Sequence, residues 1–326
     1  MNDKIIFGQY YHATSWLHRL DPRTKLISLF LMMIATFLLD DLVTLLILFG
    51  FVVLIIFSSQ IPIIKFLQSM KMMAFLLIFT IFFQIIFTKS TLPPLYTFNF
   101  DMTILNLGII IVVLVLFFLS GKWIKKSRLL LFLALIIGLF ALQNFVHITP
   151  SLFTYQVDVY ESGLVSALTI LFRIITLISL SALLTLTTKP TDLNNGLEKV
   201  SSPLRYLKIN VSILAMMISI ALRFIPTLIN EAYRILKAQA SRGVDFREGK
   251  LKEKIMQIIS LLIPMFVIAY KRAEDLANAM EARGYIPGAK RTSINELKYH
   301  TKDVVTYAVT FAIIIGIIVL KATNAI

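Results

Sequence analysis

Residues Leu164 to Thr187 read LVSALTILFRIITLISLSALLTLT, and Arg173 is the one charged residue among them. A helix needs roughly 20 predominantly apolar residues to cross the hydrocarbon core of a bilayer. The central arginine costs about 2.5–3.5 kcal/mol on the insertion scale, and each Leu, Ile, Val or Phe offsets roughly 0.3–0.6 kcal/mol of it. Because such residues are abundant here, the stretch predicts a membrane-spanning helix.

The rest of the chain has the same character. Of its 326 residues, 58% are hydrophobic and 15% are charged, whereas soluble domains carry about 25% charged residues. We therefore expect an all-α integral membrane protein. About seven spans are expected, at Leu26–Leu39, Leu42–Phe57, Met70–Thr88, Ile104–Ser120, Leu129–Phe145, Leu164–Thr187 and Val304–Leu320.

Basic residues predict the orientation of these spans. With the N-terminus in the cytoplasm, only Lys89 and Lys321 are basic residues on the outer side, as the positive-inside rule requires. The net charge of +14 then suits anionic lipid at the cytoplasmic face. Nucleic-acid binding is the weaker interpretation, because no basic stretch is interleaved with aromatic residues.

The segment from Lys189 to Asp303 contains two further apolar runs, Val211–Ile229 and Ile255–Tyr270. If both crossed the membrane, the strongly basic loop between them would lie outside, against the positive-inside rule. Each run also contains a proline, Pro226 or Pro264, which favours a kink. We expect two long kinked amphipathic helices at the cytoplasmic side. The predicted division is an N-terminal segment 1–25, spans 26–188, a coupling module 189–303, and a last span and tail 304–326.

The two expected helices end alike. One ends Ser241-Arg242-Gly243 and the other Ala282-Arg283-Gly284. Arginine in the last turn and glycine just beyond it form a common helix cap. Two guanidinium groups held at rigid helix ends also suit pairing with carboxylates or carbonyls of a partner protein. The two interpretations are compatible, and the repetition of the motif favours partner docking.

Several short motifs follow one another along the chain. They are Ser15–Leu26, Leu186–Asp192, Ala221–Pro226, the two Arg-Gly helix ends and Arg291-Thr292. As an ordered set they resemble the transmembrane T component of energy-coupling factor transporters, the family that includes the cobalt-transport permease subunit. The resemblance covers most of the chain outside roughly Leu92–Tyr160. The first helix end reads Ser-Arg-Gly where that family has Ala-Arg-Gly.

The resemblance implies partners and a mechanism. The Arg242 and Arg283 motifs would sit in grooves of two ABC-type ATPase subunits, or of an ATPase homodimer, and ATP-driven closure would move the helices. That motion would topple a separate small membrane protein that binds the vitamin or metal ion. The chain itself would be no enzyme, need no cofactor and lie in the prokaryotic cytoplasmic membrane. Residues expected to support the coupling helices are Arg223, Pro226, Glu231, Gln239, Asp245, Pro264 and Glu281. Relative to the family pattern, the spans within 104–145 are extra.

Other interpretations of the sequence are weaker. A self-sufficient secondary carrier would need several polar groups deep in its spans, whereas Arg173 is the one basic group there. We expect Arg173 to bond backbone carbonyls or a side chain such as Gln84 or Gln143. The scattered histidines predict no metal site, and the absence of cysteine excludes disulfides and thiolate ligands. The substrate is not readable from this chain.

Overall fold

The computed structural model of the chain describes residues 10–71, 73–102, 153–208, 210–244, 251–289 and 296–323, with isolated helical residues between 108 and 138. The chain divides into two compact units, each assembled from distant segments. Unit 1 comprises Met1–His12, Leu17–Ser28 and Leu184–Tyr307, and unit 2 comprises Ala13–Trp16, Leu29–Leu183 and Ala308–Ile326.

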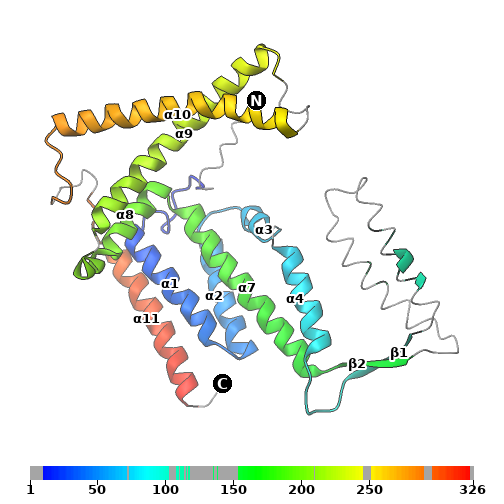
Figure 1. The fold of residues 1–326 in the computed structure, drawn as a ribbon. Helices are drawn as coiled ribbons and strands as arrows, with labels where there is room; N and C mark the ends of the chain where they lie inside the picture. Colours follow the sequence, from blue (N-terminus) through cyan, green and yellow to red (C-terminus); the bar gives the residue numbers. More distant parts are fainter. Residues whose placement is uncertain are drawn as a thin grey trace. The chain divides into compact units, whose positions relative to one another are not determined.

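Most described residues are helical, as expected for an all-α membrane protein (Figure 1). Five helices match five of the expected spans: α1 (Pro22–Leu38), α2 (Leu42–Ser58), α4 (Ala74–Phe87), α7 (Glu161–Thr187) and α11 (Thr301–Ala322). The expected spans Ile104–Ser120 and Leu129–Phe145 lie largely outside the described residues. The count of seven spans therefore stays a prediction.

Unit 2 shows how local sequence determines these helices. Asp41 caps α2, because its carboxylate accepts hydrogen bonds from the backbone N–H groups of Val43 and Thr44. Four α2 residues at helical spacing are buried and form part of the core: Leu45, Leu48, Val52 and Ile56. The ring of Phe49 packs on that of Phe172 in α7, with 5.3 Å between centroids.

Two features of unit 2 differ from the sequence prediction. The expected span Met70–Thr88 is not one helix: Met70 and Lys71 end a separate helix, α3 (Ile63–Lys71), and α4 begins at Ala74. A short two-stranded antiparallel sheet of β1 (Tyr96–Met102) and β2 (Phe153–Val159) was also not predicted. Its last pair joins Met102 to Phe153.

Unit 1 contains the predicted coupling module. Its elements are α8 (Pro190–Val200), a 3-10 turn (Ser202–Leu207), α9 (Val211–Ser241) and α10 (Leu251–Ala282). Both α9 and α10 continue through their prolines, and a helix of about 30 residues is roughly 45 Å long. Figure 1 shows α10 crossing over α9.

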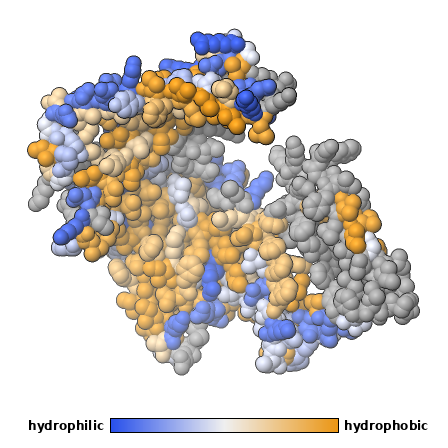
Figure 2. All heavy atoms as spheres, in the orientation of Figure 1, coloured by the Kyte–Doolittle hydropathy of each residue, from blue (hydrophilic) through white to orange (hydrophobic). Residues whose placement is uncertain are grey.

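Four described helices are long and apolar enough to cross a membrane: α7, α9, α10 and α11. The helices α2 and α4 are apolar but shorter. Length and composition thus leave α9 and α10 open as possible spans, and their cytoplasmic placement remains a prediction from loop charge. No residue of α10 is buried, and hydrophobic side chains gather along it in Figure 2.

Candidate functional site

The first Arg-Gly motif ends α9 in a left-handed cap. Arg242 is the C-cap residue, and Gly243 has φ 87°. The N–H of Gly243 donates to the carbonyl of Ala240 at 3.0 Å, and the N–H of Val244 donates to that of Gln239 at 3.1 Å. This pair of bonds is a Schellman motif.

The second Arg-Gly motif ends α10 in the same way. Gly284 has φ 69°, and its N–H donates to the carbonyl of Glu281 at 2.9 Å. The N–H of Tyr285 donates to the carbonyl of Met280 at 3.0 Å. The capping interpretation therefore describes both ends, and each arginine occupies the same position of the same motif.

The motif side chains are accessible. Ser241, Arg242, Ala282 and Arg283 are all exposed. Among the described residues, none of the ion pairs includes either motif arginine. Two exposed guanidinium groups on defined helix ends can donate charged hydrogen bonds to carboxylates or backbone carbonyls.

An ion pair links α9 and α10 to each other. The guanidinium of Arg272 in α10 lies 3.0 Å from the carboxylate of Glu231 in α9, and both side chains are partly buried. Arg234, one turn along α9, lies 3.6 Å from the same carboxylate. The pair Glu231–Arg234 lies within one helix at spacing i, i+3, whereas Glu231–Arg272 joins two helices. The contact between helices favours movement of α9 and α10 together.

The other residues predicted from the sequence lie at several separate places. Arg223 and Arg283 line one pocket of about 590 Å³ at the side of α9 and α10. The two prolines lie inside the helices, Gln239 and Glu281 accept the capping bonds through their carbonyls, and Asp245 lies outside the described residues. Arg173 donates to the backbone carbonyl of Leu39, one of the predicted alternatives, and lies 3.7 Å from the Asp40 carboxylate. Gln143 lies outside the described residues.

A polar cluster that sequence reasoning did not assign lies at the base of the coupling module. We call Asp21, Arg23, Lys25 and Asp303 the polar joint. Asp21 caps α1, since its carboxylate accepts the N–H of Arg23 at 2.8 Å and pairs with that guanidinium at 2.8 Å. Arg23 also donates to the carbonyl of Leu297 at 2.8 Å. The Asp-Pro-Arg sequence of a capped helix start was the available signal.

Asp303 joins the two ends of the chain within unit 1. Its side chain has no exposed surface. One carboxylate oxygen accepts the N–H of Asp21 at 2.9 Å, and the other accepts the N–H of His300 at 2.7 Å. These bonds hold the start of α1 against the start of α11.

Lys25 is the buried cation of the joint. Its ammonium donates to the carbonyls of Thr187 at 3.0 Å and His18 at 3.3 Å, so it caps the C-terminus of α7. Burial lowers the pKa of Lys25 from 10.5 to about 8, although the carboxylates of Asp192, Asp303 and Asp21 act in the opposite direction.

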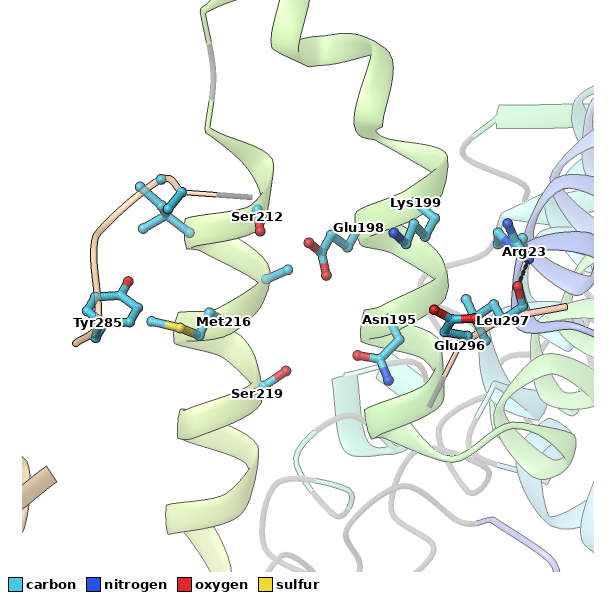
Figure 3. Close-up of a pocket in the computed structure, with 14 residues that line it drawn as sticks. Arg23, Asn195, Glu198, Lys199, Ser212, Met216, Ser219, Tyr285, Glu296 and Leu297 are labelled. Carbon is cyan, nitrogen blue, oxygen red and sulfur yellow. Dashed lines mark hydrogen bonds between the residues drawn. The ribbon is translucent and has the colours of Figure 1, made fainter. Parts of the chain in front are cut away.

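Helix α8 connects the joint to α9. The buried Asn194 donates to the carbonyl of Ala215 at 2.8 Å and to the Ser219 hydroxyl at 2.7 Å. Gly196 lies so close to Pro22 that an added Cβ would be 2.9 Å from the Pro22 Cβ. A polar pocket of about 520 Å³ lies between α8 and α9, and Figure 3 shows Glu198 and Ser212 facing each other across it.

Comparison with known proteins gives consistent matches. The family model described as "Cobalt transport protein" (CbiQ) matches residues 13–111 and 100–294. The energy-coupling factor transporter transmembrane protein EcfT of Bacillus subtilis (strain 168) is 36% identical over 322 residues, covering 99% of this chain and 97% of the relative. The protein of that name from Macrococcus caseolyticus is 34% identical over 321 residues, with 98% and 100% covered. That from Listeria innocua is 33% identical over 303 residues, with 93% of each chain covered.

Proposed function

The chain belongs to the CbiQ/EcfT family of transmembrane transporter proteins, and we propose that it couples two ATPase subunits to a substrate-binding membrane subunit. The family places it in the cell membrane as a multi-pass component of an energy-coupling factor transporter. The imported micronutrient, a vitamin or a transition-metal ion, would be recognised by the other membrane subunit.

The repeated helix end is the observation that carries this proposal. Arg242 and Arg283 occupy the same position of two matching caps, and both are exposed. Each would dock in a groove of one ATPase subunit, or of one half of a homodimer. ATP hydrolysis would then take place in the ATPases, and this chain would receive their movement.

The contacts within unit 1 provide a route for that movement. The Glu231–Arg272 pair joins α9 to α10, and Asn194 joins α8 to α9. A displacement at either arginine would therefore move the three helices together. The exposed apolar side chains of α10, including Phe266 and Ile263, would contact lipid or the substrate-binding subunit.

The topology of the proposal follows from charge. Crossing of the membrane by both α9 and α10 would export their basic connection, so we place residues 189–303 in the cytoplasm with the N-terminus. The family model matches two ranges that overlap at residues 100–111, and the second range runs through the predicted extra spans within 104–145. Since β1 and β2 pair up to Met102 and Phe153, both strands would lie on the same side of the membrane. The chain would then cross the membrane an even number of times between them, and the coupling module would stay on the cytoplasmic side.

The carrier alternative finds less support in the described residues. A secondary carrier binds its solute at polar groups near the membrane midplane. Arg173, the basic group near the middle of an expected span, is instead engaged with the Leu39 carbonyl and lies near Asp40.

The direct test is loss of ATPase association. We expect Arg242→Glu combined with Arg283→Glu to abolish co-purification of the co-expressed ATPase subunits. Each change replaces a guanidinium with a carboxylate, which would repel a carboxylate of the partner. Lys271→Glu, an exposed charge reversal on α10, serves as the control. Unchanged co-purification of the double variant, with the protein folded and inserted, would leave helix capping as the sole role of the two arginines.

A second test separates the coupling subunit from a carrier. Purification in mild detergent should bring along two ATPases and at least one small membrane protein, which mass spectrometry would identify. The purified chain alone should transport nothing in liposomes. Solute uptake by the isolated chain, driven by an ion gradient, would support the carrier instead.

A further inference from the structure

Arg223 of α9 and Arg283 of α10 meet at one pocket. The α9 wall consists of Met216, Ser219 and Ile220 with Arg223, and these positions lie on one face of the helix. Leu276 and Met280 of α10 also line the pocket, and Arg283 follows directly after the helix. The loop after the Arg-Gly end closes the pocket with Tyr285, Ile286 and Ala289.

The pocket combines two positive charges with apolar walls. Both arginines are exposed, and no acidic residue is among those that line the pocket. Its volume of about 590 Å³ is larger than a lone carboxylate requires. Met216 of α9 and Met280 of α10 both line the pocket, and methionine adapts its shape to an inserted side chain. The pocket is therefore complementary to an anionic group attached to an apolar body.

The Arg-Gly cap fixes this geometry. Gly284 turns the chain at φ 69°, so Tyr285 and Ile286 fold back beside the last turn of α10. Met280 and Tyr285, which share a capping hydrogen bond, both line the pocket. The same local motif thus ends the helix and forms one side of the pocket.

We propose that this pocket receives an acidic side chain, with an adjoining apolar residue, from one ATPase subunit, and that Arg223 and Arg283 bind its carboxylate together. Arg223 thereby becomes a partner-recognition residue rather than only a support of the helix. The inference rests on the proposed function, because it takes the ATPase as the partner at the Arg283 end. Two guanidinium groups can satisfy all the acceptor positions of one carboxylate.

The charges around the pocket favour a single acidic side chain over a lipid surface. Glu274, Asp275 and Glu281 are exposed on the last turns of α10. A bilayer of anionic headgroups would face these carboxylates as well as the two arginines, which costs repulsion. A side chain that projects from a protein reaches the arginines alone.

The first experiment compares single substitutions in the complex with co-expressed ATPase subunits. Arg223→Gln and Arg283→Gln should each weaken ATPase binding about 10- to 100-fold, the effect of losing one charged hydrogen-bonding partner. Arg223→Lys should retain part of the affinity, because it keeps the charge but not the planar fork. Lys271→Gln on α10 is the matched control and should bind as the unmodified chain does. Thermal unfolding of each free variant should show that all are folded.

A second experiment identifies the inserted segment. The chain contains no cysteine, so Ile286→Cys introduces a unique thiol at the pocket for a photoactivatable cross-linker. Mass spectrometry should find a cross-linked ATPase peptide that contains Asp or Glu. Neutralising that residue should weaken binding as Arg223→Gln does, and combining the two changes should add little further loss.

The outcomes separate this inference from the proposed function. If Arg283→Gln weakens binding and Arg223→Gln behaves like Lys271→Gln, the shared pocket is wrong and the ATPase docking stands. If neither Arg242→Gln nor Arg283→Gln weakens binding, the docking function itself fails. If Arg223→Gln leaves ATPase binding unchanged but releases phosphatidylglycerol detected by native mass spectrometry, the pocket binds lipid and the inference is overturned.

Discussion

The polar joint and helix α10 lie in the same unit but are built in opposite ways. In the joint, Asp303, Lys25 and Asp21 are buried, and they bond residues from distant parts of the chain. In α10, by contrast, none of the residues Leu251–Ala282 is buried. The joint satisfies its polar groups within the chain, whereas α10 offers its surface to other molecules. Changes in the joint should therefore alter folding, and changes at the motif arginine that follows α10 should alter assembly.

The largest expected effect on stability is at Asp303. Asp303→Ala removes the acceptors of the Asp21 and His300 N–H groups. It also removes one of the carboxylates that stabilise the buried charge of Lys25. We expect a loss of about 3 kcal/mol, the typical cost of hydrogen bonds to a buried charge, measured by thermal unfolding in detergent. Asp275→Ala on α10 should leave the unfolding temperature unchanged. Equal losses for the two variants would contradict the contrast between joint and coupling helix.

The pH dependence of stability tests Lys25. Folding lowers its pKa from 10.5 to about 8, so the unfolded chain binds more protons between these values and stability rises with pH across that window. Below about pH 8 both states are protonated, and the full cost of the buried charge is present. The total rise is about 3 kcal/mol. Lys25→Met should remove this rise, and a variant with an unchanged slope would show that another group titrates.

The next prediction compares a closely packed glycine, Gly196 where α8 meets the start of α1, with an open one, Gly50 in α2. Gly196→Ala places a Cβ 2.9 Å from the Cβ of Pro22 and 3.2 Å from its carbonyl carbon. We expect a loss of about 2 kcal/mol from overpacking, measured by chemical or thermal unfolding. Gly50→Ala in α2, where the added Cβ meets nothing within 4 Å, is the control and should not destabilise. An equally stable Gly196→Ala variant would mean that α8 can shift without loss.

The smallest expected effect on stability is at the two caps. Gly243→Ala and Gly284→Ala each place a side chain at positive φ, which costs about 1 kcal/mol. Because both caps have the same hydrogen bonds, the two losses should be similar. ATPase co-purification should nevertheless fall, since each change redirects the chain beside a motif arginine. Unaltered assembly would show that the arginines dock without a defined cap.

Part of this architecture was predictable from local patterns. The expected span Leu164–Thr187 lies within α7, which begins three residues earlier. The two Arg-Gly ends form the caps that their residues predict. Aromatic and polar residues alternate in Tyr96–Met102, a pattern typical of a strand, within a chain whose long apolar runs favour helices.

The sequence by itself determined that the chain is a helical membrane protein, where its long helices lie and how two of them end. Those properties depend on residues within one or two turns of each other, or on apolar length, so they can be read along the chain. Only the tertiary structure brought Asp303 to Asp21 and Glu231 to Arg272, and placed Arg223 and Arg283 on one pocket. Each of these arrangements depends on how the helices pack against one another. The sequence pattern of one segment does not specify which distant segment it will contact.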